Sequence, residues 1–246
     1  MTGRARNKIN ILILYAFLSI LVYAAQASAH SSSKSHNHKS SQSAPEQLSC
    51  KASKPSLSVK TATTRTKYIR TKSSKDLTQL HGGGGSSVGG LGGGEIGFKT
   101  EGKFEITEAG GKACVKLKQL EVTFYAKPEI HIASNFNRST CEHNAVMAHE
   151  KGHIRILRKF VREFSPKVKV FLSKYVYKID PAIGPIPKSQ VNEAQKKIQE
   201  QYMSKLEAYQ NKIMPILGKR QKAHDSPQEY ARVASKCSKW DKKLAQ

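Results

Sequence analysis

The second half of the chain repeats its apolar residues with the period of an α-helix. From Cys141 to about Phe164 apolar side chains recur three and four positions apart, which is typical of one buried helix face. Pro166 predicts a break after this helix, because proline clashes with the preceding turn. A loop with three prolines is expected at 180–187. We expect the remaining helices at 167–177, 189–219 (with a bend at Pro215) and, behind a Ser226 capping box, 226–237.

The preceding segment has the pattern of β-strands. Residues 103–107 predict a short strand and Gly110-Gly111 a turn. In 114–124 both alternating faces carry apolar residues, so burial is expected to change sides through a bulge. Ile130 and Ile132 face one way in a further strand over 129–134. The pattern predicts an α+β fold, with a small antiparallel sheet followed by a helical half.

The N-terminus has the features of a secretory signal. Arg4, Arg6 and Lys8 precede an apolar run, and Ala27-Ser28-Ala29 suits signal peptidase. We therefore predict a signal peptide over 1–29 and a periplasmic or secreted protein. The alternative is a retained N-terminal membrane anchor that leaves the rest of the chain facing outside.

The region between this signal and the strands is polar. Residues 30–79 are mostly Ser, Thr, Lys and His, and 82–94 are almost all Gly and Ser. Such segments bury too little apolar surface to offset the entropy of ordering, so we expect a disordered basic tail and a flexible linker over 30–94. The folded domain is then expected to span 95–246.

Four cysteines fit an exported protein. An even count predicts two disulfides, and four cysteines allow three pairings. Our first choice is Cys114–Cys141 with Cys50–Cys237, because the first pair flanks the predicted strands and the second pins both ends of the chain. Alternatively, Cys50 is free or pairs with another molecule. No CxxC spacing of a structural zinc site is present.

The formal net charge of +24 raises the question of nucleic acid. Much of the excess lies in the polar tail, and Trp240 is the only tryptophan, so the aromatic and basic signature of an RNA-binding sheet is missing. We expect no specific nucleic-acid partner. A non-specific attraction to anionic envelope surfaces, weakened by salt, is expected instead.

The chemistry resides in one motif, His149-Glu150-Lys151-Gly152-His153, which matches H-E-x-x-H. Residues four apart share a helix face, so His149 and His153 can hold one zinc ion. Glu150 then acts as general base on a zinc-activated water and returns the proton to the leaving amine. The helix follows a predicted sheet edge, so a zincin-like fold is expected. The alternative is a surface helix whose His and Glu face water.

The motif and its surroundings resemble a bacterial family of predicted secreted zinc-dependent proteases of otherwise unknown function. The resemblance rests on the strand from Cys114, Ser139-Thr140-Cys141 before the helix, Val146 to His153, and Asp225 to Tyr230 followed by Cys237. It covers roughly 98–240. It implies zinc ligands His149 and His153 and a catalytic Glu150, but no particular substrate.

The third zinc ligand is open at this point. The metzincin pattern needs a histidine where Lys159 stands, which excludes that branch. His224 and Asp225, just before the last helix, are candidates, although each also fits an ordinary helix end. His131 is a candidate for binding substrate or stabilising the oxyanion, or else an ordinary edge-strand histidine. Glutamates from following helices are the other choice: Glu163, Glu193, Glu200, Glu207 and Glu229.

These features predict an exported zinc metallopeptidase acting on a peptide or protein. Two other functions remain at this point. One is a non-catalytic envelope binding protein with a structural or vestigial metal site. The other is a cationic protein that binds anionic surfaces through its tail.

Overall fold

A computed structural model of the chain describes residues 48–240 except 52, 83–86, 177 and 239. The predicted signal peptide and the first part of the predicted tail lie outside the described residues. Within the part that is described, no helix combines the length and apolar character needed to cross a membrane.

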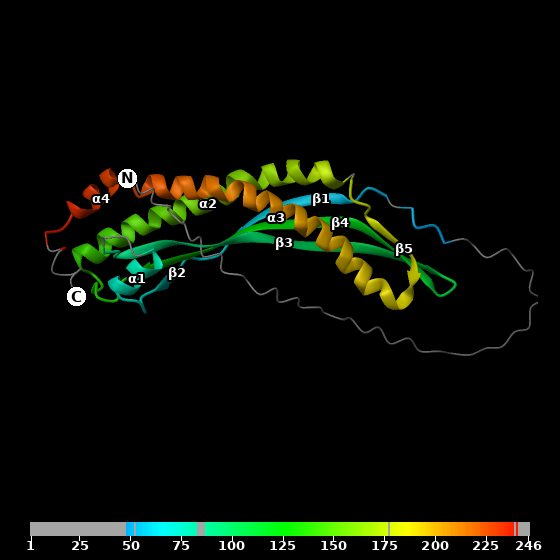
Figure 1. Ribbon diagram of the computed structural model, residues 1–246, viewed down its shortest axis with the longest axis horizontal. Coiled ribbons are helices and arrows are strands. Elements are labelled where there is room, and N and C mark those ends of the chain that lie inside the picture. The colour runs from blue at the N-terminus through cyan, green and yellow to red at the C-terminus, as the bar shows by residue number, and fades with distance from the viewer. Residues whose placement is uncertain (1–47, 52, 83–86, 177, 239, 241–246) are drawn as a thin grey trace, which may run out of the picture. The chain divides into compact units, whose positions relative to one another are not determined.

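One long strand, β4 (Lys112–Ile132), forms the centre of the sheet (Figure 1). β3 (Gly90–Ala109) pairs antiparallel with one edge of β4 over almost its whole length. The other edge pairs first with β5 (Ala182–Pro187), which is antiparallel, and then with β1 (Ser56–Thr63) and β2 (Lys67–Ile69), which are parallel. Three short strands thus follow one another along the second edge of β4.

The predicted small antiparallel sheet is therefore wrong, because β1 and β2 run parallel to β4 in a mixed five-stranded sheet. Both strands come from the basic segment that the sequence was expected to leave disordered. Leu57 and Val59 alternate with Ser, Thr and Lys and pack against the core. Ordered structure thus begins well before Glu95. After β2 the chain passes through α1 (Ser74–Leu80) into β3, so the Gly-rich segment also contributes to the sheet.

The predicted bulge in β4 is confirmed. Lys103 pairs with Gln119 and Phe104 with Leu117, so the register shifts and Lys118 is the extra residue. Before the bulge the odd-numbered side chains, such as Leu117, are buried, and after it the even-numbered ones are. The switch keeps apolar side chains facing the helices along both parts of β4.

Helices α2 (Cys141–Val176) and α3 (Val191–His224) cover one face of the sheet (Figure 1). Between them and β4 lies the main core, whose burial removes apolar surface from water and holds helices and sheet together. Its fully buried members include Leu120, Val122, Phe124, Leu157, Phe160, Val161, Val168, Leu172, Ile198, Tyr202 and Leu206. A smaller cluster, with Leu77, Ile130, Ile132, Phe136, Val146 and Ile154, packs near the start of α2.

The helix break predicted at Pro166 is wrong, because α2 continues through this proline. α3 contains Pro215 within a single helix, as predicted, and extends to His224. Buried Phe164 and Val168 flank the first proline, so packing of this face outweighs the hydrogen bond that proline cannot make. Residues 182–187, expected to form a loop, form β5. The last helix, α4 (Pro227–Ala234), begins as predicted, with the Ser226 hydroxyl accepting from the Glu229 N–H.

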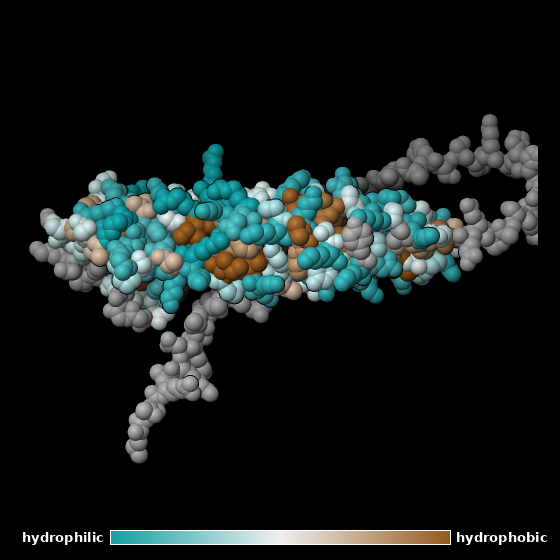
Figure 2. Space-filling model, turned by 90° about the horizontal axis from the view of Figure 1, so that it is seen from above, coloured by the Kyte–Doolittle hydropathy of each residue, from teal (hydrophilic) through white to brown (hydrophobic). Residues whose placement is uncertain are grey.

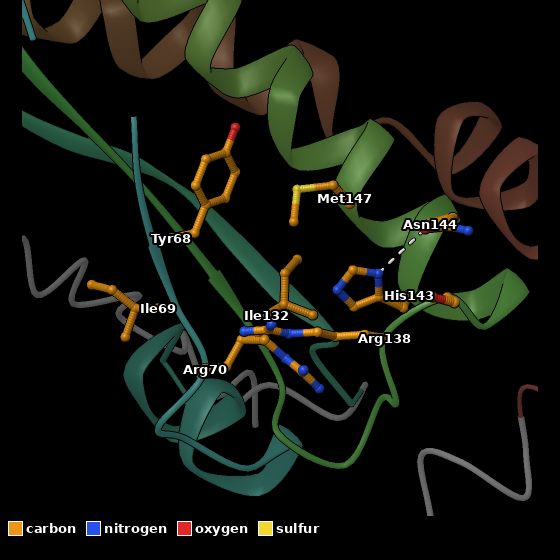
Figure 3. Close-up of a pocket in the computed structure, with 9 residues that line it drawn as sticks. Tyr68, Ile69, Arg70, Ile132, Arg138, His143, Asn144 and Met147 are labelled. Atoms are coloured by element: carbon orange, nitrogen blue, oxygen red, sulfur yellow. Dashed lines mark hydrogen bonds between the residues drawn. The ribbon is translucent and has the colours of Figure 1, made fainter. Parts of the chain in front are cut away.

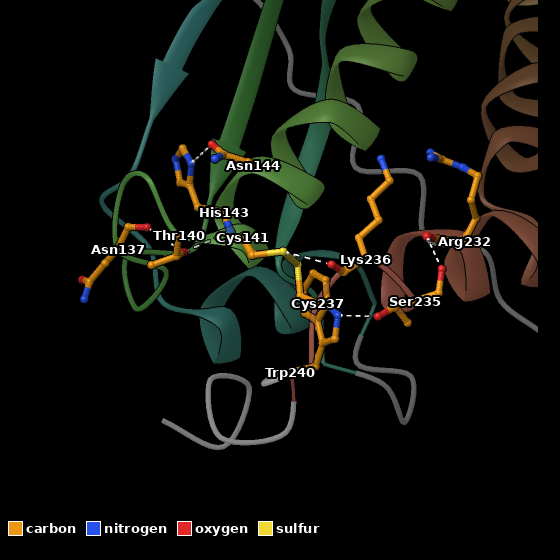
Figure 4. The surroundings of a disulfide bond; sticks show 11 residues. Asn137, Thr140, Cys141, His143, Asn144, Arg232, Ser235, Lys236, Cys237 and Trp240 are labelled. Carbon is orange, nitrogen blue, oxygen red and sulfur yellow. Dashed lines mark hydrogen bonds between the residues drawn. A yellow bond between two sulfur atoms is a disulfide. The ribbon is translucent and has the colours of Figure 1, made fainter.

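All four cysteines form disulfides, but not in the expected pairs. The bonds are Cys50–Cys114 and Cys141–Cys237. Pairing depends on which Cα atoms come within about 7 Å, which the tertiary structure decides. Cys141 begins α2 and Cys237 follows α4, so this bond fastens α4 to the start of α2 (Figure 4). Two disulfides indicate an oxidising, extracellular or periplasmic setting.

Candidate metal centre

The H-E-x-x-H motif lies in the first half of α2, as predicted, and its side chains are buried. His149, Glu150 and His153 are 5%, 4% and 6% exposed. The rings of the two histidines lie 5.0 Å apart, one helical turn from each other. Buried polar groups are costly unless they find partners. The alternative of a water-facing surface motif is thereby excluded.

Glycines in β3 make room for this part of α2. A Cβ atom on Gly92 would lie 2.6 Å from the Glu150 carbonyl oxygen and 2.9 Å from the His153 Cβ. One on Gly90 would lie 2.6 Å from a Val146 methyl group and 2.9 Å from the Glu150 side chain. The backbone of Gly92 also hydrogen-bonds the Glu150 carboxyl. The glycine segment, expected to be a linker, therefore forms the part of β3 against which Glu150 packs.

The end of α3 brings a third histidine to the pair. The ring of His224 stacks on that of His149, with centroids 4.6 Å apart and planes within 9°. Its Nε2 lies 3.1 Å from the carbonyl oxygen of His149. A Cβ on Gly152 would lie only 2.0 Å from this nitrogen, so the glycine inside the motif permits the approach. The candidate ligand atoms of His149, His153 and His224 all lie within 4.8 Å of one another, a cluster that could hold a metal ion.

A carboxylate from the α3–α4 junction completes the cluster. Asp225 Oδ1 lies 3.1 Å from His149 Nε2 and 2.8 Å from His153 Nε2. The other ring nitrogens also face oxygen atoms. His149 Nδ1 lies 3.3 Å from Glu229 Oε1, and His153 Nδ1 lies 2.6 Å from Gln221 Oε1.

These contacts shift the pKa values of the groups involved. Burial disfavours charged imidazoles, but the neighbouring acceptors, chiefly Asp225, outweigh it and raise the pKa of both His149 and His153. Burial also opposes the charge on Asp225, yet its contacts with the two histidines hold its pKa well below the ordinary range. For Glu150, burial dominates the attraction of the histidines and raises the pKa to about 7. The metal-free cluster is thus a strongly coupled group of acids and bases.

Of the other predicted site residues, only Glu229 has a described contact with the histidine cluster. His131 is on β4, 3.8 Å from Glu129, and among the described residues no hydrogen bond or ion pair joins it to the histidine cluster. Glu163 pairs with Arg220 at 2.7 Å. Of the five glutamates considered as ligands, only Glu229 has a described contact with the cluster. Glu229 faces the Nδ1 atom of His149, on the side of the ring opposite to the Nε2 atom that faces Asp225.

Sequence reasoning missed three contributors to the site. These are Gln221, the glycines of β3, and Tyr230, whose ring lies 5.6 Å from that of His149. Burial and the nearby carboxylates raise the pKa of Tyr230 to about 12, so it is a neutral hydroxyl donor at neutral pH. Gln221 lies one helical turn before Asp225, a spacing that could have indicated a shared face.

A separate hollow of about 430 Å³ lies beside the first turns of α2 (Figure 3). Arg70, Arg138, His143 and Met147 are among its lining residues, and none of the clustered histidines is. The Arg70 guanidinium donates to the carbonyl oxygens of Ser134 and Phe136, so it fastens the chain between β4 and α2. The hollow is therefore distinct from the candidate metal centre.

Comparison with known proteins gives no relative: no family model, no curated protein and no solved structure matches this chain. The function must be inferred from the residues and their arrangement.

Proposed function

We propose that this chain is an exported zinc-dependent metallopeptidase that hydrolyses peptide bonds. The observation that carries the proposal is the contact of buried His149 and His153 with the partly exposed Asp225, beside a buried Glu150. Imidazole nitrogens and carboxylate oxygens are the donors that zinc prefers. Because several acceptor oxygens converge on the two imidazoles, a bound cation suits the cluster. His149 and His153 hold the metal, and the third ligand comes from the α3–α4 junction.

Zinc in such a site supplies a Lewis acid and makes hydroxide available near neutral pH. Glu150 takes the proton from the attacking water and passes it to the leaving amine. Its position between α2 and the glycines of β3 fixes the carboxyl next to the histidines. Tyr230, whose ring lies beside that of His149 and whose neutral hydroxyl hydrogen-bonds Asp225, can redirect this hydroxyl to donate to the oxyanion of the substrate.

Its substrate is a peptide or protein outside the cytoplasm. The high positive charge adds a non-specific attraction to anionic envelope surfaces, which fades as salt is raised. Seen from the side of the helices, the surface is mainly hydrophilic, with apolar patches between the polar regions (Figure 2).

One test combines zinc content with hydrolysis. We expect one zinc per chain in the wild type and none in His149→Ala/His153→Ala, measured by elemental analysis. Glu150→Gln should retain zinc but reduce hydrolysis of a denatured protein substrate by about 10²–10⁴-fold, because the general base is lost. Glu142→Gln is the matched control, since Glu142 is also buried on α2 but lies two turns away. Equal activity in the Glu150→Gln and wild-type proteins would remove Glu150 from the mechanism.

A second candidate function is supported by the number of donors. His149, His153, His224 and Asp225 together could supply four ligands, and a fully protein-ligated zinc is typical of structural sites. The chain would then be an envelope binding protein with a structural metal. Zinc retained without hydrolysis of any peptide library, in the wild type and in Glu150→Gln alike, would favour this function.

A further inference from the structure

We propose that Asp225 is the third metal ligand, through its Oδ1 atom, and that His224 is a positioning residue outside the ligand set. This inference rests on the proposed zinc site and deepens it. It assigns the ligand to the short junction between α3 and α4, whose helices end and begin on either side of Asp225 and Ser226.

The distances around Asp225 match those between ligands of one ion. Two ligands of a tetrahedral zinc, each about 2.0–2.1 Å from the metal, stand roughly 3.3 Å apart. Asp225 Oδ1 is 3.1 Å from one histidine Nε2 and 2.8 Å from the other. The same oxygen atom therefore faces both Nε2 atoms. The separations are those of ordinary N···O hydrogen bonds, and a shared metal would need them to lengthen by only a few tenths of an ångström.

The hydrogen-bond pattern calls for added protons or a metal ion at this point. A neutral imidazole has one N–H donor and one lone pair. His149 and His153 each present Nδ1 to an oxygen acceptor, from Glu229 and Gln221. That contact places the hydrogen on Nδ1 and leaves the Nε2 lone pair facing another acceptor, Asp225. Two acceptors that face each other repel. The contacts become attractive only if each Nε2 carries a proton, or if a metal ion lies between the two Nε2 atoms and Asp225 Oδ1.

The orientation of His224 fits a supporting role. Its ring plane is within 9° of the plane of His149 on which it stacks. An imidazole would bind a metal through a lone pair that lies in its ring plane, so two stacked, parallel rings would not both direct a lone pair at one ion. Its Nε2 also faces the His149 carbonyl oxygen at 3.1 Å, as a donor would. His224 therefore fixes the ring and the backbone of a ligand.

The side chain of Asp225 is 24% exposed, whereas the two histidines are almost fully buried. With two histidines and one carboxylate as ligands, a fourth position stays available for water or substrate, as a catalytic zinc requires. The ligand assignment thus bears directly on whether the site is catalytic or structural.

X-ray absorption spectroscopy of the zinc-loaded, full-length wild-type protein tests the assignment without any substitution. We expect two imidazole ligands with oxygen donors completing the shell. Three imidazoles would overturn the role of Asp225 but leave the proposed metallopeptidase standing. No bound zinc at all would overturn both. Two imidazoles without hydrolysis would support the ligand assignment and contradict the proposed function.

A pair of near-isosteric variants gives an independent readout. Zinc dissociation constants, from competition with a chromophoric chelator, should rise more than about 100-fold in Asp225→Asn but less than about 100-fold in His224→Gln, because outer partners typically contribute 10–100-fold. Circular dichroism of the metal-free proteins checks that both variants fold. A larger loss of zinc affinity in His224→Gln than in Asp225→Asn would contradict the proposal.

Discussion

The two halves of α2 pack against the same sheet but bury different kinds of side chain. The second half buries Phe160, Val161, Phe164, Val168 and Leu172 in the main core. The first half buries Glu142, His149, Glu150 and His153 among its few apolar residues. One continuous helix therefore has an end that stabilises the fold and an end that is suited to chemistry.

The difference shows what buried polar groups require. Each apolar side chain of the second half contributes roughly 1.5–3 kcal/mol by leaving water. The polar side chains of the first half cost free energy until a partner or a metal satisfies them. Two features compensate at this end: glycines in β3 allow close packing of Glu150, and the Cys141–Cys237 bond fastens α4 near the histidines. We therefore expect substitutions in the two halves to affect different properties.

The largest effect on stability should come from Phe160→Ala in the second half. Phe160 is fully buried and packs on Phe124 and Phe164. Removing its ring should lower the free energy of unfolding by about 3–5 kcal/mol, measured by urea denaturation. At temperatures where the variant is folded, its zinc content should equal that of the wild type. A variant that keeps most of its stability but loses zinc would show that the second half of α2 also determines metal binding.

The two disulfides also allow effects on stability to be separated from effects on zinc binding. Each double serine variant should lose about 2–5 kcal/mol of stability in urea, because both bonds close long loops, of 64 and 96 residues. Only Cys141→Ser/Cys237→Ser should also weaken zinc binding. This bond holds α4 near His149, and α4 carries Glu229, which contacts His149. Cys50→Ser/Cys114→Ser is the matched control. Equal zinc affinity in the two variants would contradict a role for the Cys141–Cys237 bond in the site.

The smallest effect is expected from Gly152→Ala. Alanine gains up to about 1 kcal/mol of helix propensity over glycine, but here its Cβ displaces the His224 ring. Gly218→Ala on α3 is the matched control, because a Cβ there meets nothing within 4 Å. Thermal unfolding should show the control to be stabilised and Gly152→Ala to gain less or to lose stability. An equal gain in both variants would mean that His224 is not held against Gly152.

Several elements could be predicted from local patterns alone. The helical period from Cys141, the alternation in β4 and the Ser226 cap each depend on residues a few positions apart. The bulge at Lys118 was indicated because apolar residues change sides along one strand. The pairing of His149 with His153 follows from helix geometry. For the same reason Glu150 could be placed beside them.

The tertiary structure decided what depends on contacts distant in sequence. Leu57 and Val59 are too sparse among Ser, Thr and Lys to predict β1, which is ordered only by pairing with β4. The disulfide pairs depended on where α4 returns to α2. Asp225 could be named as a candidate from its place before the last helix, but its contact with the histidines, like that of Gln221, spans more than sixty residues and depends on how α3 packs against α2. The sequence by itself determined the helix that carries the H-E-x-x-H motif. The packing of α3 and of the glycines of β3 around this helix completed the candidate site, because only chain segments brought together by the core can supply its remaining partners.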